Sequence, residues 1–229
     1  STKGDLKNMR LSDLKAGSNT KQTLLLPVAS HYPIEMTVIC GSCPGKTLVV
    51  TAGVHGCEYV GIETLNRLKK ELDPIDLSGR IILLPLVNPE GFYMGSKQII
   101  PADGQNLNRT FPGDPEGTFS SRLAKLLEET LYPEADFLID LHGGDVNEAL
   151  TPLVFFPTTV SDALAAKASA AAASLSIPYR VASTAKNGLY SWAAQCGIPA
   201  LLAERGERGL WCEDEVTACK RNIFELMAH

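Results

Sequence analysis

The stretch TLVVTAGVHGCEYVGIETLNRLKKEL, residues 47–72, is the part of the sequence that decides the fold. It opens with an apolar run, Thr47–Gly53, that is typical of a strand, and it closes with a helix-like pattern from Glu58 to Leu72. His55-Gly56-Cys57-Glu58 lies where the strand gives way to the helix. A strand that leads directly into a helix is the building unit of α/β proteins, so this stretch predicts that class.

The same alternation of strand and helix patterns continues along the chain. We expect strands at Thr23–Ala29, Glu35–Gly41, Thr47–Gly53, Arg80–Val87, Ala135–Leu141, Pro152–Phe156 and Pro199–Ala203. We expect helices at Glu58–Leu72, Phe119–Leu131, Ser161–Leu175, Gly188–Cys196 and Asp214–Met227. Several of these strands are too apolar to have one face in water. The pattern therefore predicts a mixed or mostly parallel sheet that is covered on both faces.

Composition narrows the possible partners. The 229 residues are 45% hydrophobic and 21% charged, which suits one globular domain spanning residues 1–229. A formal net charge of -5 gives no basic surface for nucleic acid, and no apolar run is long enough to span a membrane. The first ten residues are polar, unlike a signal peptide. We therefore expect a cytoplasmic protein that acts on a small molecule.

The cysteines give no sign of a special role. Six are scattered along the chain without a secretory signal, so we expect reduced thiols and no disulfide framework. Cys40-Gly41-Ser42-Cys43 is a lone CxxC without a second pair, and we interpret it as structural and not as a metal or redox site.

Polar residues follow four of the expected strands. These residues are His55, Asn88, His142 and Glu204. In open α/β sheets, ligands bind in the crevice outside the carboxyl ends of the strands. The four side chains are therefore expected to converge on one site.

His55, Glu58 and His142 can together form a metal site. Two histidines and one glutamate, with a fourth position left to water, are the ligands of one class of catalytic zinc site. We accordingly predict one zinc ion per chain. Each residue also has a plainer interpretation: His55 can be an ordinary loop histidine, Glu58 can stabilise a helix N-terminus, and His142 can be a core histidine bonded to backbone.

A zinc hydrolase also needs a group that carries protons. Glu204, at the end of an apolar strand, is the candidate, because partial burial of a carboxyl raises its pKa. Glu207 is the rival, three residues later. The alternative for Glu204 is a surface carboxylate paired with Arg205 or Arg208.

The segment from Asp103 to Arg109, DGQNLNR, combines a turn with two amides and an arginine. Arginine and a neighbouring asparagine suit a substrate carboxylate, although the same segment read alone fits a capping loop.

These motifs, in this order, resemble the succinylglutamate desuccinylase/aspartoacylase family of zinc-carboxypeptidase-like hydrolases. The resemblance runs from about Thr47 to Gly206 and includes Asn88-Pro89-x-Gly91, the DGQNLNR segment with the following Phe111-Pro112-Gly113, and Glu204-x-Gly206. It implies a three-layer α/β/α catalytic domain with a central mixed, mostly parallel sheet. The reaction it implies is hydrolysis of an N-acyl amino acid or a similar amide.

The resemblance also implies roles for individual residues. His55, Glu58 and His142 would bind zinc, and Glu204 would act as general base and then general acid. Asn108 and Arg109 would bind the substrate carboxylate. Asn106 and Asp140 would support the metal ligands, Asn106 by accepting a ring N–H of His55.

The chain departs from the family pattern in two ways. Relatives often carry a carbonyl-polarising arginine before the Asp-Gly turn, whereas this chain has Lys97, which would act there as a point charge. Many relatives also add a β-rich C-terminal domain, which we expect to be absent here. Two alternatives remain open: a metallocarboxypeptidase that uses the same residues, and a catalytically silent zinc-binding domain.

Overall fold

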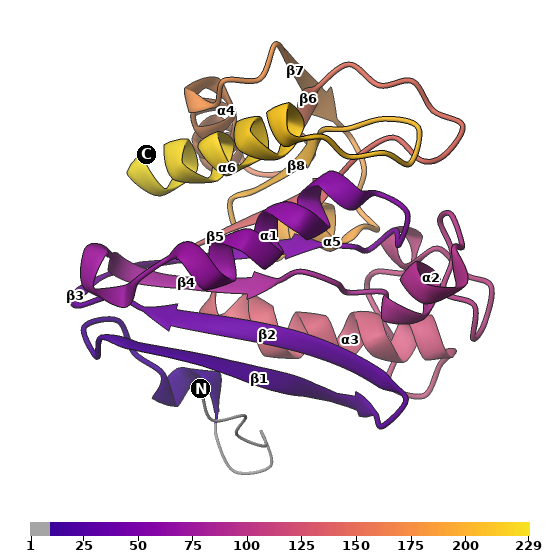
Figure 1. Cartoon of the computed structure of the whole chain (residues 1–229), viewed down its shortest axis with the longest axis horizontal. Coiled ribbons are helices and arrows are strands. Elements are labelled where there is room, and N and C mark those ends of the chain that lie inside the picture. The colour runs from indigo at the N-terminus through magenta and orange to yellow at the C-terminus, as the bar shows by residue number, and fades with distance from the viewer. Residues whose placement is uncertain (1–9) are drawn as a thin grey trace.

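One mixed sheet runs through the molecule, with strand order β1-β2-β4-β3-β5-β8-β6-β7 (Figure 1). The computed structural model describes residues 10–229. Its strands are β1 Thr20–Ala29, β2 Tyr32–Cys40, β3 Cys43–Ala52, β4 Ser78–Leu84, β5 Phe137–His142, β6 Leu153–Pro157, β7 Tyr179–Ser183 and β8 Ala200–Glu204. Its α-helices are α1 Tyr59–Glu71, α2 Pro89–Met94, α3 Phe119–Leu131, α4 Asp162–Ser174, α5 Leu189–Gln195 and α6 Glu213–Ala228.

Helices cover both faces of this sheet. Buried residues of α3 and α5 pack on one face together with Leu138 and Leu202. Buried residues of α1, α4 and α6 pack on the other face, where Ile139 and Leu201 contribute the neighbouring strand positions. Successive residues of β5 and β8 therefore enter opposite cores, as the two-residue period of a strand requires. The predicted three-layer α/β/α architecture is confirmed.

The centre of the sheet is parallel. β3 pairs in parallel with both β4 and β5, and β5 pairs in parallel with β8, so the carboxyl ends of four strands lie at one edge. The antiparallel pairs are β1 with β2, β2 with β4, and β6 with β8. This arrangement brings the ends of β3, β5 and β8 next to one another, because the three strands are neighbours.

The elements predicted from sequence are all present, with ends that differ by a few residues. Among the strands and α-helices of residues 10–229, β7 and α2 were missed. β7 lies at the sheet edge, where its residues are exposed or half-buried and so show no apolar run. α2 has only six residues, too few for a helical period, and is defined by the Asn88 cap and by Pro89 at its first position.

Three sequence-based predictions concern features other than the sheet. All six cysteines are free thiols, with Cys40 buried and Cys43 exposed. Within residues 10–229, no helix combines the length and apolarity needed to cross a membrane. The polar stretch before Arg10, which contributed to the predicted cytoplasmic location, lies outside the described residues, and that location stays a prediction.

Candidate metal centre and active site

The loop between β3 and α1 places His55 and Glu58 at the carboxyl edge of the sheet. Gly56 lets this loop pass close to α2, because a Cβ atom there would lie 2.3 Å from the backbone nitrogen of Phe92. Glu58 is the residue that precedes the first turn of α1. His142 is the last residue of β5, the strand beside β3.

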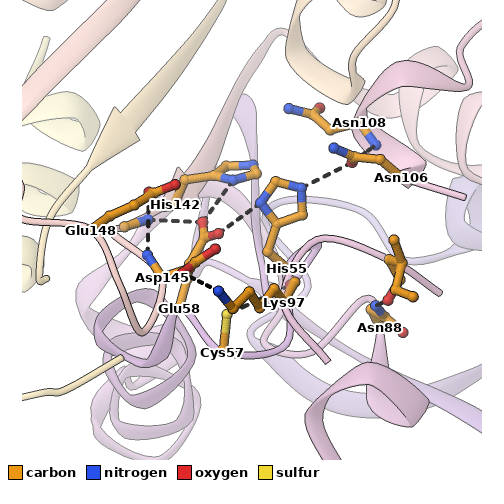
Figure 2. A network of polar contacts seen from close by, with 12 residues as sticks. His55, Cys57, Glu58, Asn88, Lys97, Asn106, Asn108, His142, Asp145 and Glu148 are labelled. Atoms are coloured by element: carbon orange, nitrogen blue, oxygen red, sulfur yellow. Dashed lines mark hydrogen bonds and ion pairs between the residues drawn. The ribbon is translucent and has the colours of Figure 1, made fainter. Parts of the chain in front are cut away.

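The Glu58 carboxylate lies between the two imidazoles (Figure 2). Its Oε2 atom is 2.7 Å from His55 Nδ1, and its Oε1 atom is 3.0 Å from His142 Nδ1. The two rings meet edge to face, with centroids 4.9 Å apart. All three side chains are buried, and one ligand atom from each lies within 4.8 Å of the others. The convergence of His55, Glu58 and His142 predicted from sequence is therefore observed.

The remaining ring nitrogens face hydrogen-bond acceptors. His55 Nε2 is 3.0 Å from Asn106 Oδ1, and His142 Nε2 is 2.6 Å from a carboxylate oxygen of Asp140. Asn106 Oδ1 also accepts the backbone N–H of Asn108 at 3.0 Å, which identifies that atom as the oxygen of the amide. Both Nε2 atoms therefore donate, and in neutral rings both Nδ1 atoms carry a lone pair.

Such a donor set fits a metal cation. In neutral rings, the two Nδ1 atoms and a Glu58 oxygen would offer lone pairs close enough together to share one ion, and the hydrogen bonds behind them favour the ligating tautomer of both rings. Burial opposes ionisation of Glu58, but His142 and His55 outweigh it and lower the pKa of Glu58 to about 2. Glu58 and Asp140 likewise stabilise positive charge at His142, and its pKa rises despite the burial of the ring. The electrostatics of the site favour a positive charge among these residues.

Glu204 lies at the end of β8, level with His142 on the adjacent strand. Burial raises the pKa of its carboxyl group, and the negative charges of Glu58 and Glu148 add to this rise, while His142 and His55 oppose it without cancelling it. No hydrogen bond from the rest of residues 10–229 engages this carboxylate. Arg205 does not pair with it, because the guanidinium turns to Asn222 and Glu215 on α6.

Glu207, the rival carboxylate, has a structural partner. Its Oε2 atom accepts the backbone N–H of Leu150 at 2.9 Å, and Gly144 donates to the carbonyl of Gly206 at 2.8 Å. Glu207 thus ties the loop after β8 to the loop after β5. Its carboxylate is engaged, whereas that of Glu204 is not.

The expected carboxylate-binding pair lies on the short helix Leu107–Arg109. Asn108 is buried, and its Oδ1 atom accepts the N–H of Leu189 at the start of α5, so its amide NH₂ group remains as a donor. Arg109 is exposed and donates to the carbonyl of Asn108. Asp103 acts differently: its carboxylate caps α3 through the backbone and hydroxyl of Ser120.

Asn88 was predicted to join this group, but it lies four residues beyond the end of β4 and does not. Its carbonyl oxygen accepts the Tyr32 hydroxyl and the backbone N–H of Gly91, and its NH₂ group donates to the carbonyl of Ile99. Asn88 therefore shapes α2 and the segment after it. Figure 2 shows it apart from the two imidazoles.

Lys97 reaches a residue that the sequence reasoning missed. Its ammonium lies 3.9 Å from Asp145 Oδ1, and its backbone carbonyl accepts the Cys57 thiol at 3.6 Å (Figure 2). Asp145 follows His142 at the same spacing as Glu58 follows His55. That repeated spacing after a second strand-end histidine was the available signal for Asp145.

Comparison with known proteins finds a family model that matches most of the chain. Residues 44–229 match the model described as the succinylglutamate desuccinylase/aspartoacylase catalytic domain. Over 100 residues, 44% of this chain, the sequence is 41% identical to the N-alpha-acetyl-L-2,4-diaminobutyric acid deacetylase of Halomonas elongata, and the match spans 29% of that protein.

Two solved structures are similar over most of the chain. The succinylglutamate desuccinylase/aspartoacylase from Rhodobacter sphaeroides superposes with a TM-score of 0.79 at 34% identity, covering 86% of this chain and 59% of that one. The product-bound ectoine utilization protein EutE (DoeB) from Ruegeria pomeroyi gives a TM-score of 0.79 at 28% identity, covering 86% and 60%. The chain thus spans well under two thirds of the length of these relatives.

Proposed function

Because this chain belongs to the succinylglutamate desuccinylase/aspartoacylase family, we propose that it is a zinc-dependent amide hydrolase that deacylates a small, carboxylate-bearing N-acyl substrate. One observation carries the proposal: the Nδ1 atoms of His55 and His142 both face the Glu58 carboxylate, while both Nε2 atoms are engaged elsewhere. The single sheet of residues 10–229 also supports a single catalytic domain, which remains part of the proposal.

In this proposal His55, Glu58 and His142 hold one zinc ion per chain. A bound zinc ion lowers the pKa of a water molecule to about 7 and polarises a carbonyl group. Asn106 and Asp140 keep the two imidazoles in the tautomer that can bind it. Both supporting residues are themselves fixed, Asn106 by the N–H of Asn108 and Asp140 by the Thr51 hydroxyl at 2.7 Å.

Glu204 is the proposed proton carrier. As a carboxylate it would take a proton from the attacking water, and as an acid it would give that proton to the amide nitrogen while the C–N bond breaks. The products are a carboxylate and a free amine. The raised pKa of Glu204 suits both halves of this task, because the group must lose and regain a proton near neutral pH.

The substrate carboxylate is assigned to Asn108 and Arg109. Asn108 presents a donor from a fixed position, and the exposed Arg109 guanidinium supplies charge and a planar fork. Lys97 is assigned to the scissile carbonyl oxygen as a point charge. The relatives named above make N-acetyl-2,4-diaminobutyrate and N-succinylglutamate the first substrates to test.

The test is hydrolysis by the zinc-loaded protein and by its Glu204→Gln variant across N-acetyl, N-succinyl and longer N-acyl amino acids, with short peptides as a second panel. The proposal predicts turnover of at least one N-acyl amino acid by the wild type, and none by the variant, which keeps its zinc. Turnover of peptides alone would instead identify a carboxypeptidase. Zinc binding without turnover of either panel would identify a binding domain.

A further inference from the structure

Lys97 links the two segments that carry the candidate metal ligands. Its backbone carbonyl accepts the thiol of Cys57, which lies between His55 and Glu58. Its side chain crosses to Asp145, three residues beyond His142. Figure 2 marks the ion pair between the Lys97 ammonium and Asp145 with a dashed line.

The Lys97 and Asp145 side chains differ in exposure and in how firmly they are held. The Lys97 side chain is 48% exposed, whereas the Asp145 side chain is 7% exposed. Asp145 is held on both sides, because its Oδ1 atom accepts the N–H of Asn147 at 3.1 Å and its own N–H donates to Glu148 at 3.3 Å. The pairing thus joins a flexible cation to a fixed anion.

A lysine in this position needs such a partner. Its ammonium is a compact charge at the end of a flexible stem, and it lacks the planar fork that lets arginine orient itself on an acceptor. The separation of 3.9 Å is longer than a hydrogen bond, so Asp145 restricts the ammonium without consuming its donors. Since no side chain or carbonyl of residues 10–229 accepts a hydrogen bond from this ammonium, its N–H bonds stay available to a substrate oxygen.

We propose that Asp145 is a positioning residue, which holds the Lys97 ammonium beside the metal ligands where it can stabilise the negative charge that develops on the scissile carbonyl oxygen. The inference rests on the proposed function for the identity of the reaction. It adds a buried acidic residue that acts through Lys97 and touches no substrate.

The test is a double-mutant cycle with Asp145→Asn and Lys97→Met, read as kcat and KM separately. Asn keeps the oxygen that accepts the Asn147 N–H, so the loop is expected to hold its shape. Loss of the Lys97 charge is expected to lower kcat by about 100-fold, and its misplacement in Asp145→Asn by about tenfold, with KM nearly unchanged. The double variant is expected to match Lys97→Met alone, and Asp145→Glu to recover part of the loss.

A matched control is Glu35→Gln, which breaks another lysine–carboxylate pair, Lys69 with Glu35 at 3.4 Å, away from the site. It is expected to leave kcat unchanged. Full additivity of the Asp145 and Lys97 effects, or an unchanged kcat in Asp145→Asn, would overturn the inference.

A binding measurement separates this inference from the proposed function. A phosphonate analogue of an N-acyl amino acid carries the charge of the tetrahedral intermediate and is expected to bind more weakly to both single variants, again without additivity. If the wild type hydrolyses no substrate, the proposed function fails, and the phosphonate affinities still decide the role of Asp145. Equal affinity of the wild type and Asp145→Asn would count against it.

Discussion

Replacement of Asp140 by Asn is expected to weaken zinc binding by about 10- to 100-fold, or about 1.4 to 2.8 kcal/mol. Asp140 is fully buried, and its two oxygens have separate tasks. One accepts the ring N–H of His142 at 2.6 Å, and the other accepts the Thr51 hydroxyl at 2.7 Å. An asparagine has only one acceptor to offer at this position.

The size of the loss in zinc affinity depends on which way the new amide group is oriented. If its oxygen stays with Thr51, its NH₂ group faces His142, whose Nε2 atom must then accept. The ring proton moves to Nδ1, the atom that faces Glu58, and the metal loses a ligand. If the oxygen stays with His142, the Thr51 hydroxyl can rotate to accept the NH₂ group. Because this second arrangement exists, zinc binding should weaken and not disappear.

The assay is competition for zinc between the protein and a chromophoric chelator at fixed pH. Thr51→Val is the control, because it removes the hydroxyl and leaves the carboxylate in contact with His142. This control is expected to weaken zinc binding less than Asp140→Asn does, because it loosens Asp140 but leaves the acceptor that sets the His142 tautomer. Equal zinc affinities for Asp140→Asn and the wild type would refute the argument that Asp140 sets the His142 tautomer.

Three further predictions concern the surroundings of the site. Gly56→Ala should lower the free energy of unfolding by about 1–3 kcal/mol in urea titrations, because the added Cβ would lie 2.3 Å from the Phe92 nitrogen; an unchanged midpoint would contradict the close approach. Arg205→Met should lower the free energy of unfolding by about 3–5 kcal/mol, because the contacts of Arg205 with α6 are lost. The kcat of the folded fraction should stay unchanged. A matching loss of kcat would give Arg205 a role in catalysis. Glu148→Gln should move the acid limb of the kcat/KM profile to lower pH. Removing this negative neighbour lowers the raised pKa of Glu204, and Glu204 must be ionised to act as a base. A shift of the acid limb to higher pH would contradict the assignment of Glu204 as the base.

The sequence was sufficient where a residue lies on a regular element with a clear pattern. His142 and Glu204 could be located because each ends an apolar strand, and parallel neighbours bring such ends together. His55 and Glu58 could be located because a strand pattern is followed by a helix pattern there, and they lie in the short loop between β3 and α1. The sheet centre followed from the same apolar runs.

The sequence was insufficient where side-chain contacts determine whether a residue joins the site. Asn88 follows a strand pattern in the sequence as the others do, but its amide is used by Tyr32 and by α2, and nothing in its spacing predicts this. Glu204 and Glu207 were rivals three residues apart, and their different contacts, such as that of Glu207 with Leu150, could not be predicted from sequence. Asp145 lies in an irregular loop, where no periodicity shows which residues are buried.

Dependence on long-range contacts also explains why β7 was missed. β7 forms at an edge, so its residues remain half in water and carry no apolar signature. It is held by pairing with β6, a contact between distant residues. The local sequence of β7 does not predict this pairing.

The most direct test of the central claim is anomalous diffraction at the zinc edge from crystals of the zinc-loaded protein. We expect one strong peak per chain, about 2.0–2.2 Å from Nδ1 of His55, Nδ1 of His142 and a Glu58 oxygen. A peak on the Nε2 side of either ring, a peak elsewhere on the chain, or no peak at equimolar zinc would contradict it.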